Sequence, residues 1–165
     1  LVGDAFDPAD REALRERATS KGVGDRLEIT GNLPREQALR RMLEADVAFS
    51  PYFPVPIFLS TSPTRLVEYL ALGIPVVANH HPEQRAILRA SGAGVCTPWG
   101  ARYFARGARL LHRLGAANRR RMGSAGRDWV LENRTYDRIA ESLERKYMQL
   151  IADESPQQGR PECAT

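Results

Sequence analysis

The residues best placed to do chemistry lie together between Ser62 and Glu68, in the run SPTRLVE. The spacing of apolar residues after it predicts a helix, with Ser62 or Thr64 as its cap and Pro63 in its first turn. A helix that begins beside the strand ends of a sheet offers free amides and a positive dipole, which favours phosphate binding. Arg65 adds a cation to that end. Glu68 lies one turn beyond Thr64, within reach of a ligand bound there.

The elements that must position these residues alternate between strand and helix patterns, which predicts a parallel, doubly wound α/β sheet. Gly73 ends the helix after Thr64, because a glycine adopts a positive φ at low cost. Further helices are predicted to begin near Asp7, Pro34, Pro82, Tyr103, Asn118 and Tyr136. Strands are predicted at Leu1–Gly3, Leu27–Thr30, Val47–Ser50, Ile74–Ala78 and Gly94–Thr97. Leu1–Gly3 has the pattern of a strand's last residues, which suggests a truncated domain.

The composition indicates one domain with a real core, because 42% of the 165 residues are hydrophobic. We expect residues 1–152 to form this domain and the polar residues 153–165 to be a disordered tail. No apolar run approaches the roughly 20 residues that cross a bilayer, and we expect no signal peptide. Cys96 and Cys163 lie in different settings, so we expect no disulfide and a cytoplasmic location.

The net charge of +4 comes almost wholly from arginine. This charge allows contact with phosphate groups or with an anionic membrane surface. Nucleic acid is not an expected partner, because no basic run is interleaved with aromatic residues. The triplet Arg119–Arg121 is interpreted as a solvated helix face, with lipid phosphate contact as the alternative. A peripheral contact with the inner face of a membrane therefore stays open.

The segment from Pro51 to Thr61 is predicted to be a long, apolar loop, which is usually functional or part of an interface. Its apolar residues are expected to pack on the core or on another domain, with a membrane-bound acceptor as the alternative. After the buried strand, Asn79, His80 and His81 form a predicted turn. The histidine pair has no third ligand at a supporting spacing, so we expect no zinc site.

Three stretches, taken in order, resemble one family. Residues 22–31 (GVGDRLEITG), residues 45–51 (ADVAFSP) and above all residues 62–78 (SPTRLVEYLALGIPVVA) carry the resemblance. Residues 1 to about 147 are similar to the C-terminal, donor-binding half of a GT-B glycosyltransferase of the retaining group 1, or family 4, type. The resemblance implies a Rossmann-like doubly wound sheet, here incomplete.

The resemblance also implies where a nucleotide-diphosphate sugar binds. The diphosphate lies over the amides near Ser62, Thr64 and Arg65, and Glu68 accepts hydrogen bonds from the ribose hydroxyls. The segment Gly31, Asn32 and Leu33 lies by the nucleobase. Ser60 stands where many members carry a second glutamate that helps to hold the sugar. No catalytic residue is identified, and neither a metal nor a cofactor is expected.

The family's acceptor-binding N-terminal domain and its basic diphosphate loop would precede Leu1. We therefore expect this chain to need that missing domain as a partner and to be inactive alone. One alternative is a non-catalytic nucleotide-binding or interaction module, or a subunit of a split enzyme. A GT-B-like sugar epimerase is a weaker alternative.

Overall fold

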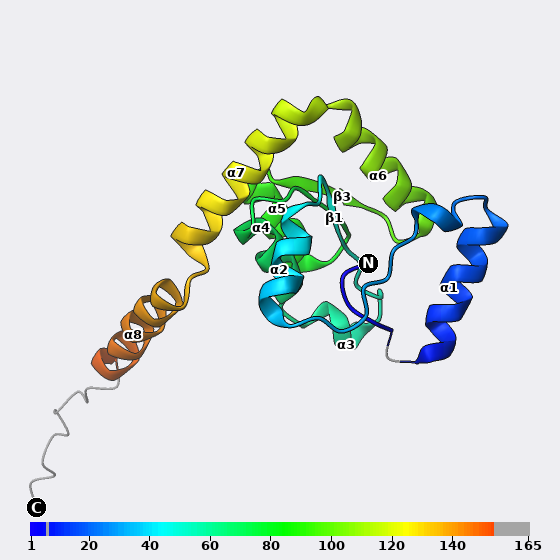
Figure 1. Cartoon of the computed structure of the whole chain (residues 1–165). Coiled ribbons are helices and arrows are strands. Elements are labelled where there is room, and N and C mark those ends of the chain that lie inside the picture. Colours follow the sequence, from blue (N-terminus) through cyan, green and yellow to red (C-terminus); the bar gives the residue numbers. More distant parts are fainter. Residues whose placement is uncertain (6, 154–165) are drawn as a thin grey trace, which may run out of the picture.

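The computed structural model describes residues 1–5 and 7–153, so the predicted tail lies outside the described residues except for Asp153. Its centre is a parallel sheet of three strands in the order β1–β2–β3 (Figure 1). The strands are β1 (Ala48–Ser50), β2 (Val76–Asn79) and β3 (Gly94–Thr97). Ala48 pairs with Val76, which pairs with Gly94. Every residue of β2 is buried, as predicted for a central strand.

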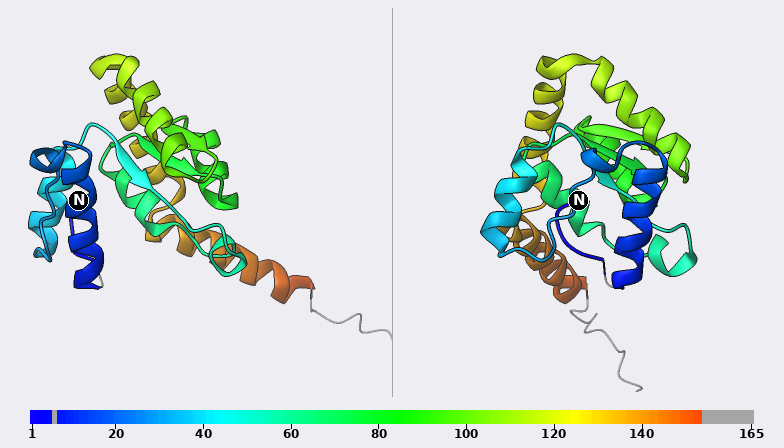
Figure 2. Two further views of the ribbon diagram at one scale, coloured as in Figure 1. Left: turned by 90° about the vertical axis from the view of Figure 1, so that its right-hand side faces the viewer. Right: turned by 45° about the vertical axis from the view of Figure 1, so that its right-hand side comes forward.

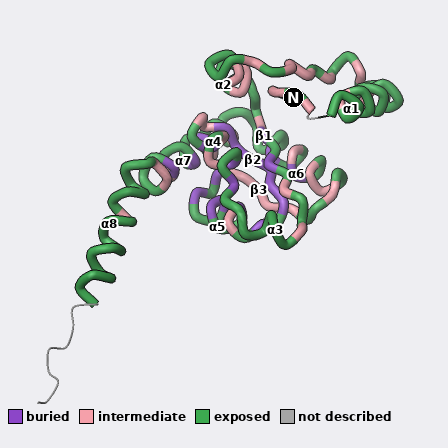
Figure 3. The backbone as a smooth tube through the Cα atoms, turned by 90° about the horizontal axis from the view of Figure 1, so that it is seen from below, coloured by how far each residue is buried: buried purple, intermediate pink, exposed green. Residues whose placement is uncertain are grey.

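Helices cover both faces of the sheet, which confirms the doubly wound arrangement. On one face Val76 and Ala78 join the core formed with α4 (Thr64–Ala71), α5 (Pro82–Ser91) and α7 (Gly115–Asn133). On the other face lies α6 (Ala101–Arg113), where Gly107 closely approaches Val77. Figure 3 shows that burial is concentrated around this sheet. The buried apolar residues are Ala48, Leu66, Leu70, Ile74, Val76, Val77, Ala78, Ile87, Leu88, Ala93, Leu111 and Val130.

The remaining helices lie around this centre. They are α1 (Pro8–Ser20), the 3-10 turn η1 (Gly24–Arg26), α2 (Arg35–Leu43), the short α3 (Pro56–Leu59) and α8 (Tyr136–Asp153). Asp7 caps α1 as predicted, accepting a hydrogen bond from Ala9 N at 2.8 Å. Helix α8 extends away from the sheet and none of its residues is buried (Figure 1).

Two predicted strands are not strands in the structure. Among the described residues, Leu1–Gly3 and Leu27–Thr30 are extended and lie outside the three-stranded sheet. Leu1 N donates to Glu28 O (2.7 Å) and Thr30 N donates to Leu1 O (3.1 Å). Gly3 and Gly31 form an isolated antiparallel bridge. Each segment thus has an extended pattern but a partner on one side only, too little for a regular strand.

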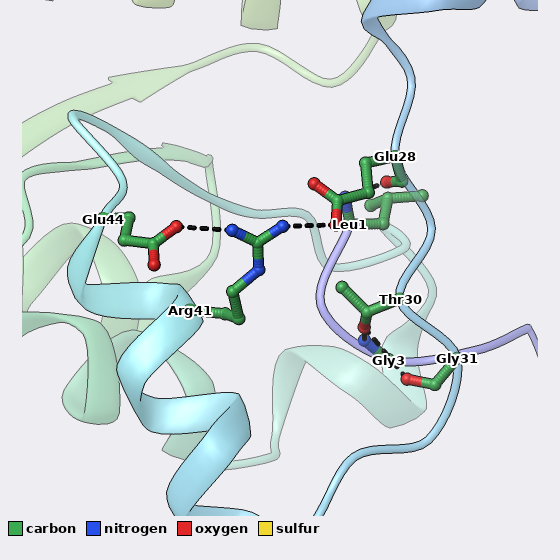
Figure 4. Close-up of polar contacts among 7 residues, drawn as sticks. All are labelled: Leu1, Gly3, Glu28, Thr30, Gly31, Arg41 and Glu44. Atoms are coloured by element: carbon green, nitrogen blue, oxygen red, sulfur yellow. Dashed lines mark hydrogen bonds and ion pairs between the residues drawn. The ribbon is translucent and has the colours of Figure 1, made fainter.

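The N-terminal elements form a layer of their own beside the sheet (Figure 2). A cavity of about 570 Å³ lies between the two, lined by Val2 and Ile29 on one side and by Ala48 and Phe49 on the other. Arg41 ties α2 to the extended segment by donating to Glu28, and it also donates to Glu44 at the end of α2 at 2.6 Å (Figure 4). These hydrogen bonds raise the pKa of the Arg41 guanidinium further above its usual value.

Candidate functional site

The start of α4 differs in detail from the prediction. Pro63 occupies the cap position, and neither Ser62 nor Thr64 caps the helix with its side chain. The helix begins at Thr64, one residue later than a helix with Pro63 in its first turn would begin. Ser62 therefore lies before the cap residue, and Thr64 is the first residue of the helix. Thr64 N donates to Ser62 O (3.0 Å) and Val67 N donates to Pro63 O (3.3 Å). The amide of the exposed Arg65 therefore precedes the first hydrogen bond of the helix, as a phosphate site requires, whereas Leu66 is buried.

Helix α4 is held firmly beneath this end. Leu66 and Leu70 are fully buried in the core. Gly73 has φ +73° and turns the chain into β2, as predicted. Its carbonyl lies so close to α7 that a β-carbon on Gly123 would come within 1.8 Å of the Gly73 oxygen. The close packing of α4 on α7 thus fixes the direction in which the helix start points.

Glu68 projects outward from α4, with half of its side chain exposed. Its Oε1 lies 3.9 Å from Nη1 of Arg35, the first residue of α2. Gly31, Asn32 and Leu33 come just before α2, so the structure brings Glu68 to the end of the segment expected by the nucleobase. The ion pair is long and exposed, and it leaves the carboxylate free to exchange Arg35 for another partner.

Arg65 lines the 570 Å³ cavity together with Gly3, Arg41 and Tyr69. The volume falls in the range of about 300–1,000 Å³ that is usual for small-molecule sites. Burial raises the pKa of the Tyr69 hydroxyl, so Tyr69 is a neutral hydrogen-bonding group there. The cavity therefore combines apolar walls with a cation next to the start of α4.

Ser60 lies apart from this cavity, at the C-terminal end of α3. Its hydroxyl donates to Ile57 O (3.0 Å), and the neighbouring Thr61 hydroxyl donates to Phe58 O (2.8 Å). The segment predicted as an irregular loop thus contains a short helix with its own hydrogen bonds. Ser62 and Thr64 follow it and are exposed.

Two buried residues, Asn79 and His81, position this segment. In the sequence, only their place after a predicted strand indicated that they have a role. Asn79 accepts from Tyr52 N (2.7 Å) and donates to Tyr52 O (2.9 Å), as a strand partner would. His81 contacts Phe58 O through Nε2 (2.8 Å) and caps α5 by accepting from Gln84 N (3.3 Å). Both nitrogens of His81 are therefore used for structure. Polar residues at the end of a buried strand are the sequence signal for such a role.

Aromatic rings extend the same surface toward β3. The Phe53 ring lies 5.1 Å from that of Trp99, which lies 6.3 Å from Phe104. The Tyr52 ring packs against the His81 ring in a tilted arrangement, with centroids 5.1 Å apart. Ile57, in contrast, is 71% exposed. The apolar segment thus packs on buried residues through Tyr52, whereas Phe53 lies against the exposed Trp99 and the α3 side chains face outward.

Within residues 1–5 and 7–153, no three His, Cys, Asp or Glu side chains are grouped so that they could hold a metal ion. None of the described helices combines the length and the apolar character needed to cross a bilayer.

The comparisons with known proteins agree with this architecture. The family model described as glycosyl transferases group 1 matches residues 1–129. Among solved structures, sucrose-phosphate synthase from Thermosynechococcus elongatus superposes with a TM-score of 0.70 at 22% identity. That match covers 92% of this chain and 38% of the synthase, so the chain spans well under half of that protein. No curated protein matches the chain. The fold is therefore Rossmann-like, of the GT-B type.

Proposed function

The chain belongs to glycosyl transferases group 1, and on that premise we propose that it is the donor-binding part of a retaining glycosyltransferase. The donor would be a nucleotide-diphosphate sugar. One observation carries the proposal: the start of α4 presents the amide and the guanidinium of the exposed Arg65, while Glu68, one turn after Thr64, faces the beginning of α2. Anion-binding groups and a carboxylate thus project from the first two turns of the same helix.

Each group has a distinct proposed role. The amide of Arg65, with the hydroxyls of Ser62 and Thr64, holds the diphosphate, and the Arg65 guanidinium neutralises part of its charge. Fixed donors of this kind stabilise the negative charge that builds on the departing diphosphate, so the proposal needs no metal or other cofactor.

The nucleoside is held from the other side. Glu68 accepts hydrogen bonds from both ribose hydroxyls and gives up its exposed contact with Arg35. Gly31, Asn32 and Leu33 contact the base. Ser60 reaches the sugar only if its hydroxyl leaves the carbonyl of Ile57, so we expect it to contribute little to donor affinity.

The acceptor side is proposed to come from polypeptide outside residues 1–165. The chain spans 38% of the synthase that it resembles in fold, which supports this view. A GT-B active site lies between two domains, so we expect the chain alone to bind donor but not to transfer sugar. We also propose that the protein is cytoplasmic and makes peripheral contact with a membrane.

Calorimetric titration with UDP, GDP and ADP tests the donor site. We expect saturable binding of one diphosphate, weakened about ten- to a hundredfold in Glu68→Ala, because a hydrogen bond to a charged group contributes about 1.5–3 kcal/mol. Glu132→Ala, which removes an exposed carboxylate of α7, should leave the affinity unchanged. A folded protein that binds none of the three would contradict donor binding by this chain.

The short coverage of the synthase also favours a second candidate, a non-catalytic nucleotide-binding module. Adding an acceptor-binding domain as a separate polypeptide distinguishes the transferase from the non-catalytic module. Transfer of sugar from the bound donor supports the transferase, whereas nucleotide binding without transfer or hydrolysis supports the module.

A further inference from the structure

Helix α6 carries arginines at positions 102, 106, 109 and 113, a spacing of four, three and four residues. On a helix with 3.6 residues per turn this spacing places all four within an arc of about 60° and along about 16 Å. All four are exposed. The helix therefore presents a single straight row of positive charge, which we call the α6 arginine row.

Among the residues that the structure describes, no carboxylate forms an ion pair with this row. The sequence has no Asp or Glu between Glu83 and Asp128. Among the described residues, the ion pairs of arginine involve Arg11, Arg35, Arg41, Arg119, Arg134 and Arg138, and none involves the row. The guanidinium of Arg102 lies 4.5 Å from the Tyr103 ring centroid, and Arg109 Nε donates to Ala105 O. Four guanidinium groups thus keep most of their donors for a ligand.

The row borders an open groove of about 1170 Å³ between α6 and β3. β3 is the last strand of the sheet, and no strand of the described residues pairs with its outer edge. Val95, Thr97 and Pro98 line the floor, and all four arginines line the wall. Leu110, beside Arg109 in the groove, is 50% exposed, and Leu114 just beyond the row is 39% exposed. The surface is therefore cationic with apolar side chains at its margin.

We propose that the α6 arginine row docks the protein on a membrane surface by binding anionic lipid headgroups. Clusters of four to eight basic residues on an amphipathic helix have the charge density that anionic lipids attract. Exposed leucines next to the row can enter the headgroup region while the long arginine side chains reach the phosphates. This docking does not depend on the proposed transferase activity.

The same surface is poorly suited to nucleic acid or to a folded acidic protein. Tyr103, the aromatic ring in the groove, is covered by Arg102 and is not free to stack on a base. A row of one charge per turn matches a layer of headgroups, which rearrange laterally to meet each arginine. A folded acidic partner would have to match the spacing with fixed carboxylates.

The α6 row differs from the triplet expected from the sequence. Arg119 donates to Asp46 (2.9 Å) and to His112 O (3.1 Å), and it is largely buried. This residue fastens α7 to the chain before β1. The consecutive triplet therefore contributes at most Arg120 and Arg121 to a surface, whereas the residues with helical spacing on α6 form the continuous one.

Co-sedimentation of the full chain with large unilamellar vesicles tests the proposal. We compare phosphatidylcholine vesicles with vesicles containing 30% phosphatidylglycerol, using wild type, R102Q/R106Q/R109Q/R113Q, and the control R15Q/R17Q/R145Q/K146Q. The control removes the same charge from exposed residues of α1 and α8. Circular dichroism verifies that all three proteins are folded.

The expected result is binding to the anionic vesicles alone, at low salt. A basic residue near an anionic surface contributes about fivefold in partitioning, so the α6 variant should lose about a hundred- to a thousandfold. The control should lose no more than about fivefold, and 300 mM NaCl should weaken the wild type strongly. Equal losses in both variants, or no binding by wild type, would overturn the proposal. So would binding to polyglutamate or RNA but not to vesicles.

Discussion

The contact between Gly73 and Gly123 allows a prediction with a definite sign. A β-carbon on Gly123 would lie 1.8 Å from the Gly73 carbonyl oxygen, whereas real β-carbons essentially never come closer than 3.0 Å. In Gly123→Ala the two helices must therefore separate by about 1.2 Å, the difference between these distances. The obstructing atom belongs to the backbone of a tight turn and cannot rotate aside, so the strain spreads into the packing of α4 on α7.

Two opposite effects decide the size of the change. Alanine is favoured over glycine inside a helix by about 1 kcal/mol. Overpacking a tight contact costs about 1–3 kcal/mol, and a rigid backbone obstacle places this case at the upper end. We expect a net loss of about 2 kcal/mol in the free energy of unfolding. For a chain of this size the midpoint of thermal unfolding should fall by about 4–8 °C.

Thermal and urea unfolding, followed by circular dichroism, measure this loss. The matched control is Ser124→Ala, which introduces the same residue one position later on an exposed part of α7. It should leave stability unchanged or raise it by about 0.5 kcal/mol. A Gly123→Ala protein as stable as the wild type would refute the inference that this glycine is required for the close approach.

Two further changes are predicted. Asn79→Ala leaves Tyr52 N and O without their partners, and should lower the free energy of unfolding by about 2–3 kcal/mol in a urea titration; a loss below 1 kcal/mol would contradict the role given to Asn79. Burial raises the pKa of the Cys96 thiol, although the charge of Arg85 offsets part of this increase. Less thiolate is therefore present at pH 8, and iodoacetamide should alkylate Cys96 more slowly in the folded protein than in the urea-unfolded chain. The measurement uses a Cys163→Ser protein, and equal rates in the two states would argue against this effect of burial.

The elements around the main motif could be predicted from sequence because their signals are local. Gly73 indicated the end of α4, and the apolar run after it indicated a buried strand, although β2 begins at Val76 and not at Ile74. The predicted cap of α4, Ser62 or Thr64, was wrong because Pro63 occupies the cap position. Proline has no side-chain acceptor, so the rules for side-chain capping do not select it. Asp7 followed the rule and was right.

The misses at Leu1–Gly3 and Leu27–Thr30 have a non-local cause. Both segments are extended, as their patterns indicate, but a strand needs partners, and a partner cannot be read from a short pattern. The same holds for Asn79, whose hydrogen bonds reach Tyr52, 27 residues away. The α6 arginine row, in contrast, is a local signal, because its helical spacing can be read from the sequence alone, whereas three consecutive arginines on a helix point in different directions.

The N-terminal layer beside the sheet has a consequence for how the molecule opens. Among the described residues, none before Ala48 is buried, so little apolar surface holds residues 1–47 to the rest. Amide hydrogens of α1 and α2 should therefore exchange with solvent through small, local openings, while those of β2 should exchange only when the whole chain unfolds. The first 47 residues are then expected to behave as a separate, weaker cooperative unit. Any ligand that bridges Glu68 and the segment before α2 would slow the amide hydrogen exchange of residues 1–47. Hydrogen exchange therefore gives a second measurement of donor binding, independent of calorimetry.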